Sequence, residues 1–555
     1  MRTNGGSKNT GARTEARPRP SRRTLIFRLI GLADLALGII YLSWRYYASL
    51  NPSALVLAIV LVAAETFAFI DTVLFVVMMW KPVARESPPA PASASVDVFI
   101  TTYNEPVELV RTTAAAATRI DWSSLAVHIL DDGARPEMEV LAAELGCGYI
   151  SRGPEWVGKA RHAKAGNVNN ALLKTSADFI LILDADQIPA PGIVRRTLGY
   201  FDDPAVAFVQ TPQSFYNTPP GDPLGTDAPL FYGPIMQGKD GWNAAFFCGS
   251  NAVLRREALL MIGLANYSES VEREFLGSID ALRMASRPKL GDSERELVAK
   301  RTLRAVVDRV QGELRAGASL EKVAVLARAA AKEFREGYAC VEADEADRRL
   351  EAVCAKGQVA PLVTKGLSLS RQDEALAVQA LSTVSVTEDM ATALRLHSSG
   401  WKSVFHPEVL AYGLAPEDLG SALSQRLRWA QGTIQVLFRE SPLSKKGLTF
   451  GQRLMYFATM YSYFSGFSNL VFVAAPLFYF FLGLSPVAAW SVDFFARFLP
   501  FYLLNRFMFV FVAWGIPVKR GEQYNLALFP LWIKAVTSVL FGRKISFAVT
   551  PKQRQ

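Results

Sequence analysis

The chain has few of the residues that build disulfide-stabilised or zinc-binding proteins, with four cysteines among 555 residues. They are Cys147, Cys248, Cys340 and Cys354. None has the CxxC spacing of a metal site, so a structural zinc is not expected. We predict reduced thiols of a cytosolic compartment and not a disulfide framework.

Charged residues are also scarce, at 20% of the chain, while half of all residues are hydrophobic. That balance is too apolar for an ordinary soluble enzyme and too polar for a transporter made only of membrane helices. There is no internal repeat, which excludes a repeat architecture. A chain that combines membrane helices with a globular domain is the simplest interpretation.

The net charge of +9 is concentrated at the N-terminus, where a basic tail covers residues 1–23. Its cations are Arg2, Lys8, Arg13, Arg17, Arg19, Arg22 and Arg23. Because the tail ends where apolar sequence begins, it fits a cytosolic anchor that follows the positive-inside rule. A nucleic-acid-binding tail is the alternative, and we expect no nucleic-acid partner.

Two apolar runs follow within residues 24–80, Thr24–Tyr47 and Ala54–Trp80. Each exceeds the roughly 20 residues that a helix needs to cross a bilayer. The first run is too long for a signal peptide, and a second span follows at once. Residues 81–95 are rich in Pro, Ala and Ser and are predicted to form a linker.

Apolar sequence returns in residues 447–541. Ser465–Leu484 and Phe495–Trp514 are predicted to span the membrane. Phe450–Tyr463 and Tyr524–Phe541 are mixed or amphipathic, which favours helices lying in the membrane interface. Residues 542–555 form a short tail, whose interpretation depends on the resemblance described below.

The globular part is predicted to be an α/β domain in two pieces, residues 96–265 and 383–446. Its apolar runs Val96–Thr101, Leu125–Leu130 and Phe179–Leu183 suit buried parallel strands separated by helices. Residues 266–382 are rich in Ala, Arg, Glu and Leu, with helical periodicity over 293–316 and 319–335. They are predicted to be a helical insertion, to which the sequence assigns no function.

Polar side chains follow each predicted strand: Asn104, Glu105, Asp131, Asp132, Asp184 and Asp186. In an open parallel sheet, ligands bind beyond the carboxyl ends of the strands, so these groups are expected to gather at one edge. Asp184 and Asp186 form an Asp-x-Asp pair that could hold Mg²⁺ or Mn²⁺ together with substrate phosphates. A strand-end turn is one alternative. A phosphatase-like loop with Asp184 as nucleophile is another, but Ile188 does not fit its pattern.

The next polar groups are ambiguous when taken singly. Asp131-Asp132-Gly133 could bind a ligand or form a helix cap or tight turn. Lys164-Ala-Gly-Asn-Val-Asn169 could contact phosphate or ribose oxygens, or could be an ordinary polar helix start. Asp389, after Thr387-Glu388, could be a general base or a helix cap.

Gln425-Arg428-Trp429 would share one helix face. An amide, a guanidinium and an indole there suit phosphate pairing and stacking on sugar rings. A membrane-proximal helix with a snorkelling Arg and an interfacial Trp is the alternative.

Taken in order, these motifs resemble the catalytic subunit of bacterial cellulose synthase, a processive family-two glycosyltransferase. The matching segments are VDVFITTYNEP (96–106), ILDDG (129–133), KAGNVNNAL (164–172), LDADQIP (183–189), VQTPQSF (209–215), FFCGSNAVLRR (246–256), VTEDMATALRLHSSGW (386–401), QRLRW (425–429) and FAVTPK (547–552). They cover most of 96–552 outside the insertion. The QxxRW, FFCGS and FxVTxK signatures make the resemblance specific.

The resemblance implies a GT-A (Rossmann-like) glycosyltransferase domain inserted between N-terminal and C-terminal transmembrane helices. The donor-binding residues would be Tyr103, Glu105, Asp132, Lys164, Asp184, Gln425 and Arg428. Metal binding would fall to Asp184 and Asp186, with Mg²⁺ or Mn²⁺ as cofactor. Asp389 would be the catalytic base. The acceptor would meet Cys248, Gly249, Glu388 and Trp429, and a gating loop would use Phe547, Val549, Thr550 and Lys552.

The function implied is polymerisation of a β-glucan, cellulose with β-1,4 linkage first, from UDP-glucose at a bacterial inner membrane. The catalytic domain would be cytosolic and would feed the glucan to a membrane channel, with a further membrane or periplasmic subunit as a partner. Gln187 stands where the family commonly has His, and the insertion is a second departure. We find no c-di-GMP-binding domain and expect no direct binding of that nucleotide. A synthase of curdlan or mixed-linkage glucan, or an inactive scaffold subunit, remains the alternative.

Overall fold

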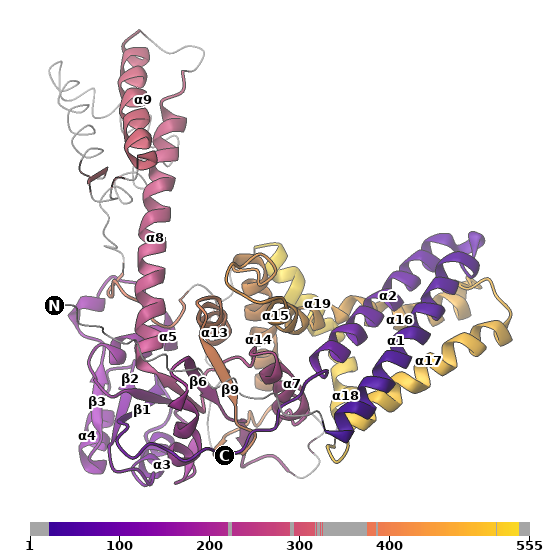
Figure 1. Cartoon of the computed structure of the whole chain (residues 1–555), viewed down its shortest axis with the longest axis horizontal. Helices are drawn as coiled ribbons and strands as arrows, with labels where there is room; N and C mark the ends of the chain where they lie inside the picture. Colours follow the sequence, from indigo (N-terminus) through magenta and orange to yellow (C-terminus); the bar gives the residue numbers. More distant parts are fainter. Residues whose placement is uncertain are drawn as a thin grey trace, which may run out of the picture. The chain divides into compact units, whose positions relative to one another are not determined.

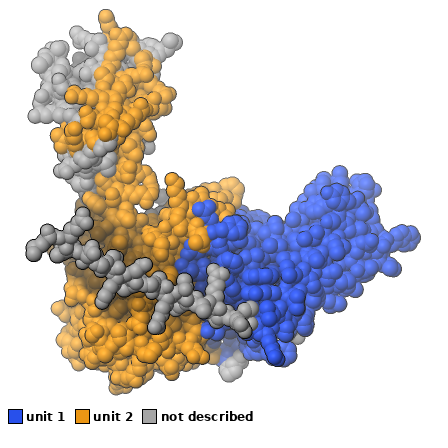
Figure 2. Space-filling model, viewed as in Figure 1, with its two compact units in different colours: residues 1–84, 219–244, 450–537 blue, residues 85–218, 245–449, 538–555 orange. Residues whose placement is uncertain are grey.

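The computed structural model describes residues 21–219, 222, 225–288, 294–316, 318, 322, 323, 325, 374–383, 387–517 and 519–542. The chain divides into two compact units (Figure 2). Unit 1 comprises 1–84, 219–244 and 450–537, and unit 2 comprises 85–218, 245–449 and 538–555. The predicted gating-loop residues 547–552 lie outside the described residues.

Unit 2 is built on a mixed seven-stranded sheet of order β3-β2-β1-β4-β8-β6-β9. Its strands are β1 (Val96–Thr102), β2 (Leu125–Asp131), β3 (Gly148–Ser151), β4 (Phe179–Asp184), β6 (Val206–Gln210), β8 (Ala252–Arg255) and β9 (Lys402–Phe405). Strands β1 to β4 run parallel, and β8 runs antiparallel between β4 and β6. A small second sheet pairs β5 (Ile188–Pro189), β10 (Ala411–Gly413) and β7 (Ser214–Phe215).

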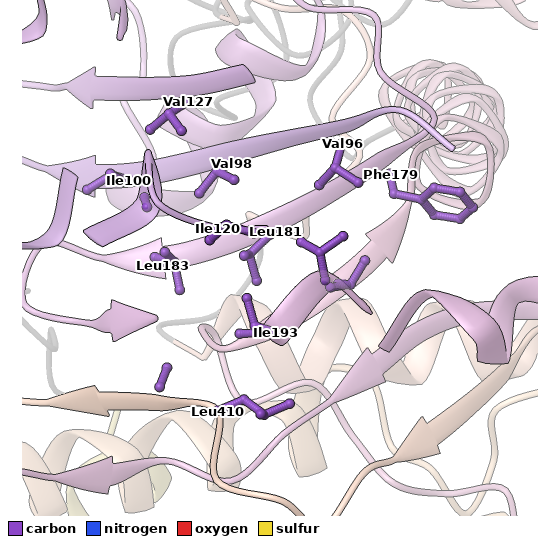
Figure 3. Packing of buried hydrophobic residues seen from close by; sticks show 14 of the residues in the cluster. Val96, Val98, Ile100, Ile120, Val127, Phe179, Leu181, Leu183, Ile193 and Leu410 are labelled. Atoms are coloured by element: carbon purple, nitrogen blue, oxygen red, sulfur yellow. The ribbon is translucent and has the colours of Figure 1, made fainter. Parts of the chain in front are cut away.

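Strand β1 is buried along its whole length, which explains why most of its residues are apolar. Val96, Val98 and Ile100 pack with side chains of β2 and β4 and of the helices on one face (Figure 3). That face is covered by α3 (Val107–Ala117), α4 (Pro136–Leu145) and α6 (Ile193–Thr197). Burial of this apolar surface drives assembly of the sheet, at roughly 25 cal/mol per Å².

The further helices described in unit 2 include those that carry the sequence motifs. They are α5 (Ala163–Leu172), α8 (Arg256–Ala285), α9 (Glu294–Arg315), α13 (Glu388–Ser398) and α14 (Leu419–Arg439), with the short 3₁₀ turns η2 (Pro154–Trp156) and η3 (Leu198–Asp202). Helix α5 lies against β1 and β2. Arg256, the first residue of α8, forms a buried ion pair with Asp97, with 2.7 Å between Nη2 and Oδ2. Arg256 thereby ties the start of α8 to β1.

The predicted insertion begins inside a helix. Helix α8 continues from β8 without an intervening loop, projects from the sheet, and has α9 packed beside its far part (Figure 1). Phe275 and Ile279 of α8 and Val307 and Val310 of α9 are buried, so an apolar seam holds the pair together. The predicted helix over 319–335 falls largely outside the described residues.

Among its described residues, unit 1 has four helices long and apolar enough to cross a membrane: α1 (Arg22–Ala48), α2 (Leu55–Met78, preceded by η1, Pro52–Ala54), α16 (Ser465–Leu482) and α17 (Ser491–Val512). They lie where the apolar runs predicted them. Arg23 donates to the Phe511 carbonyl at 2.9 Å, while Leu50 and Val487 form a β-bridge. The N-terminus of α1 and the C-terminus of α17 therefore share one side of the helix group.

Unit 1 also includes residues 219–244, which the sequence placed within the globular core. They contain η4 (Phe231–Ile235) and α7 (Met236–Gly241). Lys239 is buried and donates to the Met455 carbonyl at 2.5 Å and to Thr459 at 2.7 Å, both on α15 (Phe450–Ser462). These hydrogen bonds offset the cost of burying the Lys239 ammonium and join this segment to α15. Helix α18 (Lys519–Ala527) follows, and unit 1 ends at Thr537 within α19 (Phe529–Leu540).

Candidate active site

The parallel strands bring their carboxyl ends to one edge of the sheet, as predicted. Thr102 of β1 pairs with Asp131 of β2, and Thr101 pairs with Asp184 of β4. The residues that follow these strands consequently start from neighbouring positions, although the chain separates them by tens of residues. This edge positions the candidate active site.

The two acids after β2 have different environments. Asp131 is fully buried and accepts hydrogen bonds from the backbone N–H groups of Gly133 at 3.1 Å and Arg135 at 2.6 Å. The tight-turn interpretation therefore describes Asp131. Asp132 faces two guanidinium groups: Arg152 Nη2 donates to it at 2.8 Å and Arg161 Nη2 at 3.3 Å. Burial raises the pKa of Asp132, and the charge of Arg152 opposes that shift.

Hydrogen bonds to the Glu105 carboxylate hold the turn that follows β1. Glu105 Oε2 accepts from the Thr102 hydroxyl at 2.8 Å and from the Tyr103 N–H at 2.7 Å. Arg135 donates to the Glu105 carbonyl at 2.7 Å, which links this turn to the β2 turn. The Tyr103 side chain is half-exposed and available to a ligand.

Lys164 connects the Asp-x-Asp motif to the FFCGS segment. From the first turn of α5, its Nζ donates to Asp184 Oδ1 at 2.5 Å and to the Gly249 carbonyl at 2.7 Å. Both Lys164 and Asp184 keep some solvent exposure, at 18% and 31% of their side chains. Incoming phosphate oxygens can therefore reach this ammonium.

The two carboxylates of the Asp-x-Asp motif point to different partners. Asp186 is only 2% exposed, and its Oδ2 accepts from the Leu414 N–H at 2.9 Å. It also borders a pocket of about 360 Å³. The pocket is lined by Pro106, Glu108, Leu109, Thr112, Thr113, Asp186, Ile188 and Tyr216.

Gln187 is buried and accepts from Asn251 at 3.0 Å, so the position that departs from the family pattern supports the residue just before β8.

Glu388 and Asp389 form the first turn of α13, and the pKa of each is raised. Burial is the main cause, and the neighbouring carboxylates, including Asp184, add to it. Asp389 Oδ1 accepts from the Met390 N–H at 2.7 Å. Its Oδ2 faces Gly249, where an added Cβ would lie 3.2 Å away. Asp389 thus has one oxygen anchored to the helix and the other beside the FFCGS backbone.

Helix α14 brings its motif to the same place. A Cβ on Gly432 would lie 2.4 Å from Thr387, so α14 packs directly against the start of α13. One turn earlier, burial lowers the pKa of Arg428, and the charges of Glu388 and Asp184 oppose that shift. Trp429 is 43% exposed. The Arg428 guanidinium therefore lies close to Glu388 at the start of α13, and the Trp429 ring is open to solvent.

The predicted site residues consequently form one cluster and one neighbouring group. The cluster contains Lys164, Asp184, Gly249, Glu388, Asp389 and Arg428. The neighbouring group contains Tyr103, Glu105 and Asp132. Gln425 and Trp429 lie on the helix that carries Arg428, while Cys248 precedes Gly249. Asp186 is turned towards the backbone of Leu414.

Sequence reasoning missed several residues that hold this site. Arg152 and Arg161 contact Asp132, while Gln210 and Gln213 bind the FFCGS backbone. The signal for the glutamines was present, because VQTPQSF belongs to the motif set but received no role. Arg152 gave no local signal, since only the tertiary structure brings it to Asp132.

The described residues hold no cluster of three or more His, Cys, Asp or Glu side chains arranged as a metal site. Divalent cations in phosphate-binding sites use one or two carboxylates and complete their shell with phosphate and water. Asp184, Glu388 and Asp389 interact electrostatically near Lys164. Asp184, whose side chain is 31% exposed, is a carboxylate of the kind that such a cation uses.

Comparison with known proteins agrees with this geometry. The family model for cellulose synthase matches residues 132–553. The chain belongs to the cellulose synthase family. This member is 31% identical to the cellulose synthase catalytic subunit (UDP-forming) of Komagataeibacter sucrofermentans, over 96% of this chain and 57% of that protein. It is 29% identical to the corresponding subunit of Xanthomonas axonopodis pv. citri, over 81% of this chain and 47% of that protein.

This cellulose synthase family member therefore spans about half the length of those relatives. Among solved structures it matches the mannosyltransferase PcManGT from Pyrobaculum calidifontis, in complex with GDP-Man and Mn²⁺. That match has 13% identity and a TM-score of 0.44, and it covers 93% of this chain and all of the other. The predicted GT-A-like α/β fold with long apolar helices is confirmed by the family and the mixed sheet.

Proposed function

We propose that this chain is a processive, inverting glycosyltransferase that extends a β-1,4-glucan with glucose from UDP-glucose. One observation supports this above all. Asp389, whose pKa is raised, lies beside Gly249, and the Gly249 carbonyl binds the lysine that also pairs with Asp184. A base for the acceptor and a cation for the donor phosphates thus flank one short backbone segment.

The donor side is assigned to Lys164, Arg428 and the acids near them. Lys164 and Arg428 would pair with the diphosphate and stabilise the charge that develops on it as UDP departs. Asp184, with Asp186 nearby in the chain, would hold Mg²⁺ or Mn²⁺. A bound divalent cation would supply further neutralisation of that leaving group. Tyr103, Glu105 and Asp132 remain the proposed contacts of the nucleoside.

The acceptor side is assigned to Asp389 and Trp429. Asp389 accepts the proton of the acceptor hydroxyl while that oxygen forms a bond to the anomeric carbon. The bond between this carbon and the phosphate oxygen breaks, its electron pair stays with UDP, and the anomeric configuration inverts. The open face of Trp429 would stack on the terminal sugar and fix its angle of approach. Glu388, Gln425 and Cys248 would border the same acceptor.

We further propose that the apolar helices cross a bacterial inner membrane with the catalytic unit in the cytosol. Arg22, Arg23 and Lys81 support this placement, because α1 begins and α2 ends in basic sequence, as the positive-inside rule requires. Delivery of the glucan to a channel, and a partner subunit that completes the channel, are parts of the same proposal.

Product analysis tests this function. Purified chain given radiolabelled UDP-glucose and Mn²⁺ is expected to release UDP and to form polymer that a β-1,4-specific endoglucanase digests. Polymer sensitive only to a β-1,3-glucanase would contradict the linkage. Absence of both UDP release and polymer would contradict the enzyme assignment and favour a scaffold role.

The pH dependence of the reaction provides a second test. A general base works only when ionised, and a carboxyl with a raised pKa loses its charge at a higher pH than usual. The value of kcat/KM for UDP-glucose should therefore fall as the pH is lowered. The midpoint of that fall should lie at a pH well above the usual carboxyl pKa of about 4. Initial rates between pH 4.5 and 9 measure it. A rate that stays constant down to pH 4.5 would contradict the raised pKa.

A further inference from the structure

Three side chains of the VQTPQSF segment, at the end of β6, bind residues 248–251 in and just after the FFCGS segment. Gln210 is fully buried, accepts from the Cys248 N–H at 2.8 Å and donates to the Ser250 carbonyl at 2.9 Å. Thr211 donates to the Asn251 carbonyl at 2.8 Å. These contacts fall on Cys248, before Gly249, and on Ser250 and Asn251 after it.

Gln213 adds a contact from outside the strand. Its Nε2 donates to Ser250 Oγ at 2.8 Å and to the Cys248 carbonyl at 3.4 Å. Gln210 and Gln213 therefore hold residues 248–250 from two directions. We call the two amide side chains of Gln210 and Gln213, together with the Thr211 hydroxyl, the amide clamp.

Gly249, at the centre of the amide clamp, lies next to both the proposed donor-binding lysine and the proposed base. Gly249 has φ +90°, a conformation that L side chains rarely adopt. Its carbonyl accepts from Lys164, and its Cα faces Asp389 Oδ2. A shift of this one peptide would change the position of the donor lysine relative to the base.

We propose that the amide clamp positions Gly249, and through it aligns Lys164 with Asp389 for transfer to the acceptor. The inference rests on the proposed function and adds Gln210 and Gln213 to the residues on which transfer depends. They act through the backbone, so they are positioning residues and not catalytic ones. A misplacement of about 1 Å between reacting groups can lower a rate by about 100-fold, which makes such a support kinetically visible.

Two substitutions test the amide clamp with side chains of similar size, so that no cavity is created. Gln213→Met keeps the side-chain length and removes the contacts of the half-buried Gln213. Gln210→Glu keeps an acceptor for the Cys248 N–H but places a carboxylate against the carbonyls of Ser250 and Asn251. Gln452→Met is the matched control, because buried Gln452 donates to the Asn243 carbonyl at 2.8 Å in unit 1.

Polymerisation rates are divided by the number of UDP-binding sites, which calorimetry in Mn²⁺ measures. A smaller amount of folded protein is therefore not mistaken for a slower rate of transfer. Both clamp variants are expected to form polymer at least about tenfold more slowly per site, with UDP affinity changed by less than about threefold. Gln452→Met should keep the wild-type rate per site. Clamp variants that keep the wild-type rate per site would overturn the proposal.

A chemical readout separates failure of the clamp from failure of the proposed function. The Cys248 thiol is half-buried in the clamped segment, and Cys147 is a half-buried reference elsewhere in unit 2. Peptide-level labelling with iodoacetamide should be faster at Cys248 in both clamp variants and unchanged at Cys147. If wild type made no polymer, faster labelling would still support the clamp, and unchanged labelling would overturn it.

Discussion

Replacement of Asp389 by Asn is expected to lower polymer formation by at least about 100-fold while UDP binding changes little. General base catalysis contributes typically 10²–10⁴ to a rate, and an amide cannot accept the acceptor proton. Asn keeps the side-chain oxygen that accepts from the Met390 N–H, so the start of α13 should remain intact. Polymer synthesis in purified membranes and calorimetry with UDP measure the two quantities.

Asp418→Asn is the matched control for that substitution. Asp418 caps α14 by accepting from the Ser421 N–H at 2.8 Å, and Asn is as good a cap. This variant should synthesise polymer at the wild-type rate. Near-normal synthesis by Asp389→Asn would refute the assignment of the base.

Replacement of Asp184 by Asn is expected to remove most of the Mn²⁺-dependent part of UDP affinity. The substitution deletes a proposed metal-binding carboxylate and the anion paired with Lys164. A charged hydrogen-bonding group is worth about 1.5–3 kcal/mol, so UDP should bind roughly 10- to 150-fold more weakly in Mn²⁺. Calorimetry with UDP, in Mn²⁺ and in EDTA, measures the difference.

Asp203→Asn breaks a comparable Lys–Asp pair at the surface, where Lys402 Nζ lies 2.7 Å from Asp203 Oδ2. That variant should bind UDP as wild type does in both conditions. If Asp184→Asn retained the full response to Mn²⁺, the metal would have to bind elsewhere, and the donor side would need reassignment.

The fold could be predicted from the sequence because its signals are local and strong. The apolar runs of β1, β2 and β4 end in polar residues, and hydrophobicity and length alone indicate the four long helices. The course of α8 was harder to predict, because the helix starts at β8 and passes into the predicted insertion without a break in its pattern. Residues 219–244 look globular in composition, yet the buried ammonium of Lys239 joins them to α15.

Motif order predicted the members of the site, but only the structure separates their environments. Neighbouring acids in the sequence, Asp131 and Asp132, differ because one satisfies a turn and the other faces Arg152. Asp186 likewise bonds to Leu414, more than 200 residues away. Such partners are set by tertiary packing, and no local pattern encodes them.

The central claim is that one nucleotide-sugar site lies between Lys164, Asp184, Asp389 and Arg428. An electron cryo-microscopy structure of the full chain with UDP and Mn²⁺ tests it most directly. The account predicts metal density at Asp184 and the diphosphate within hydrogen-bonding distance of Lys164 and Arg428, with Asp389 facing the vacant acceptor position. UDP bound in the pocket beside Pro106 and Tyr216, or Asp389 turned away from the nucleotide, would contradict it.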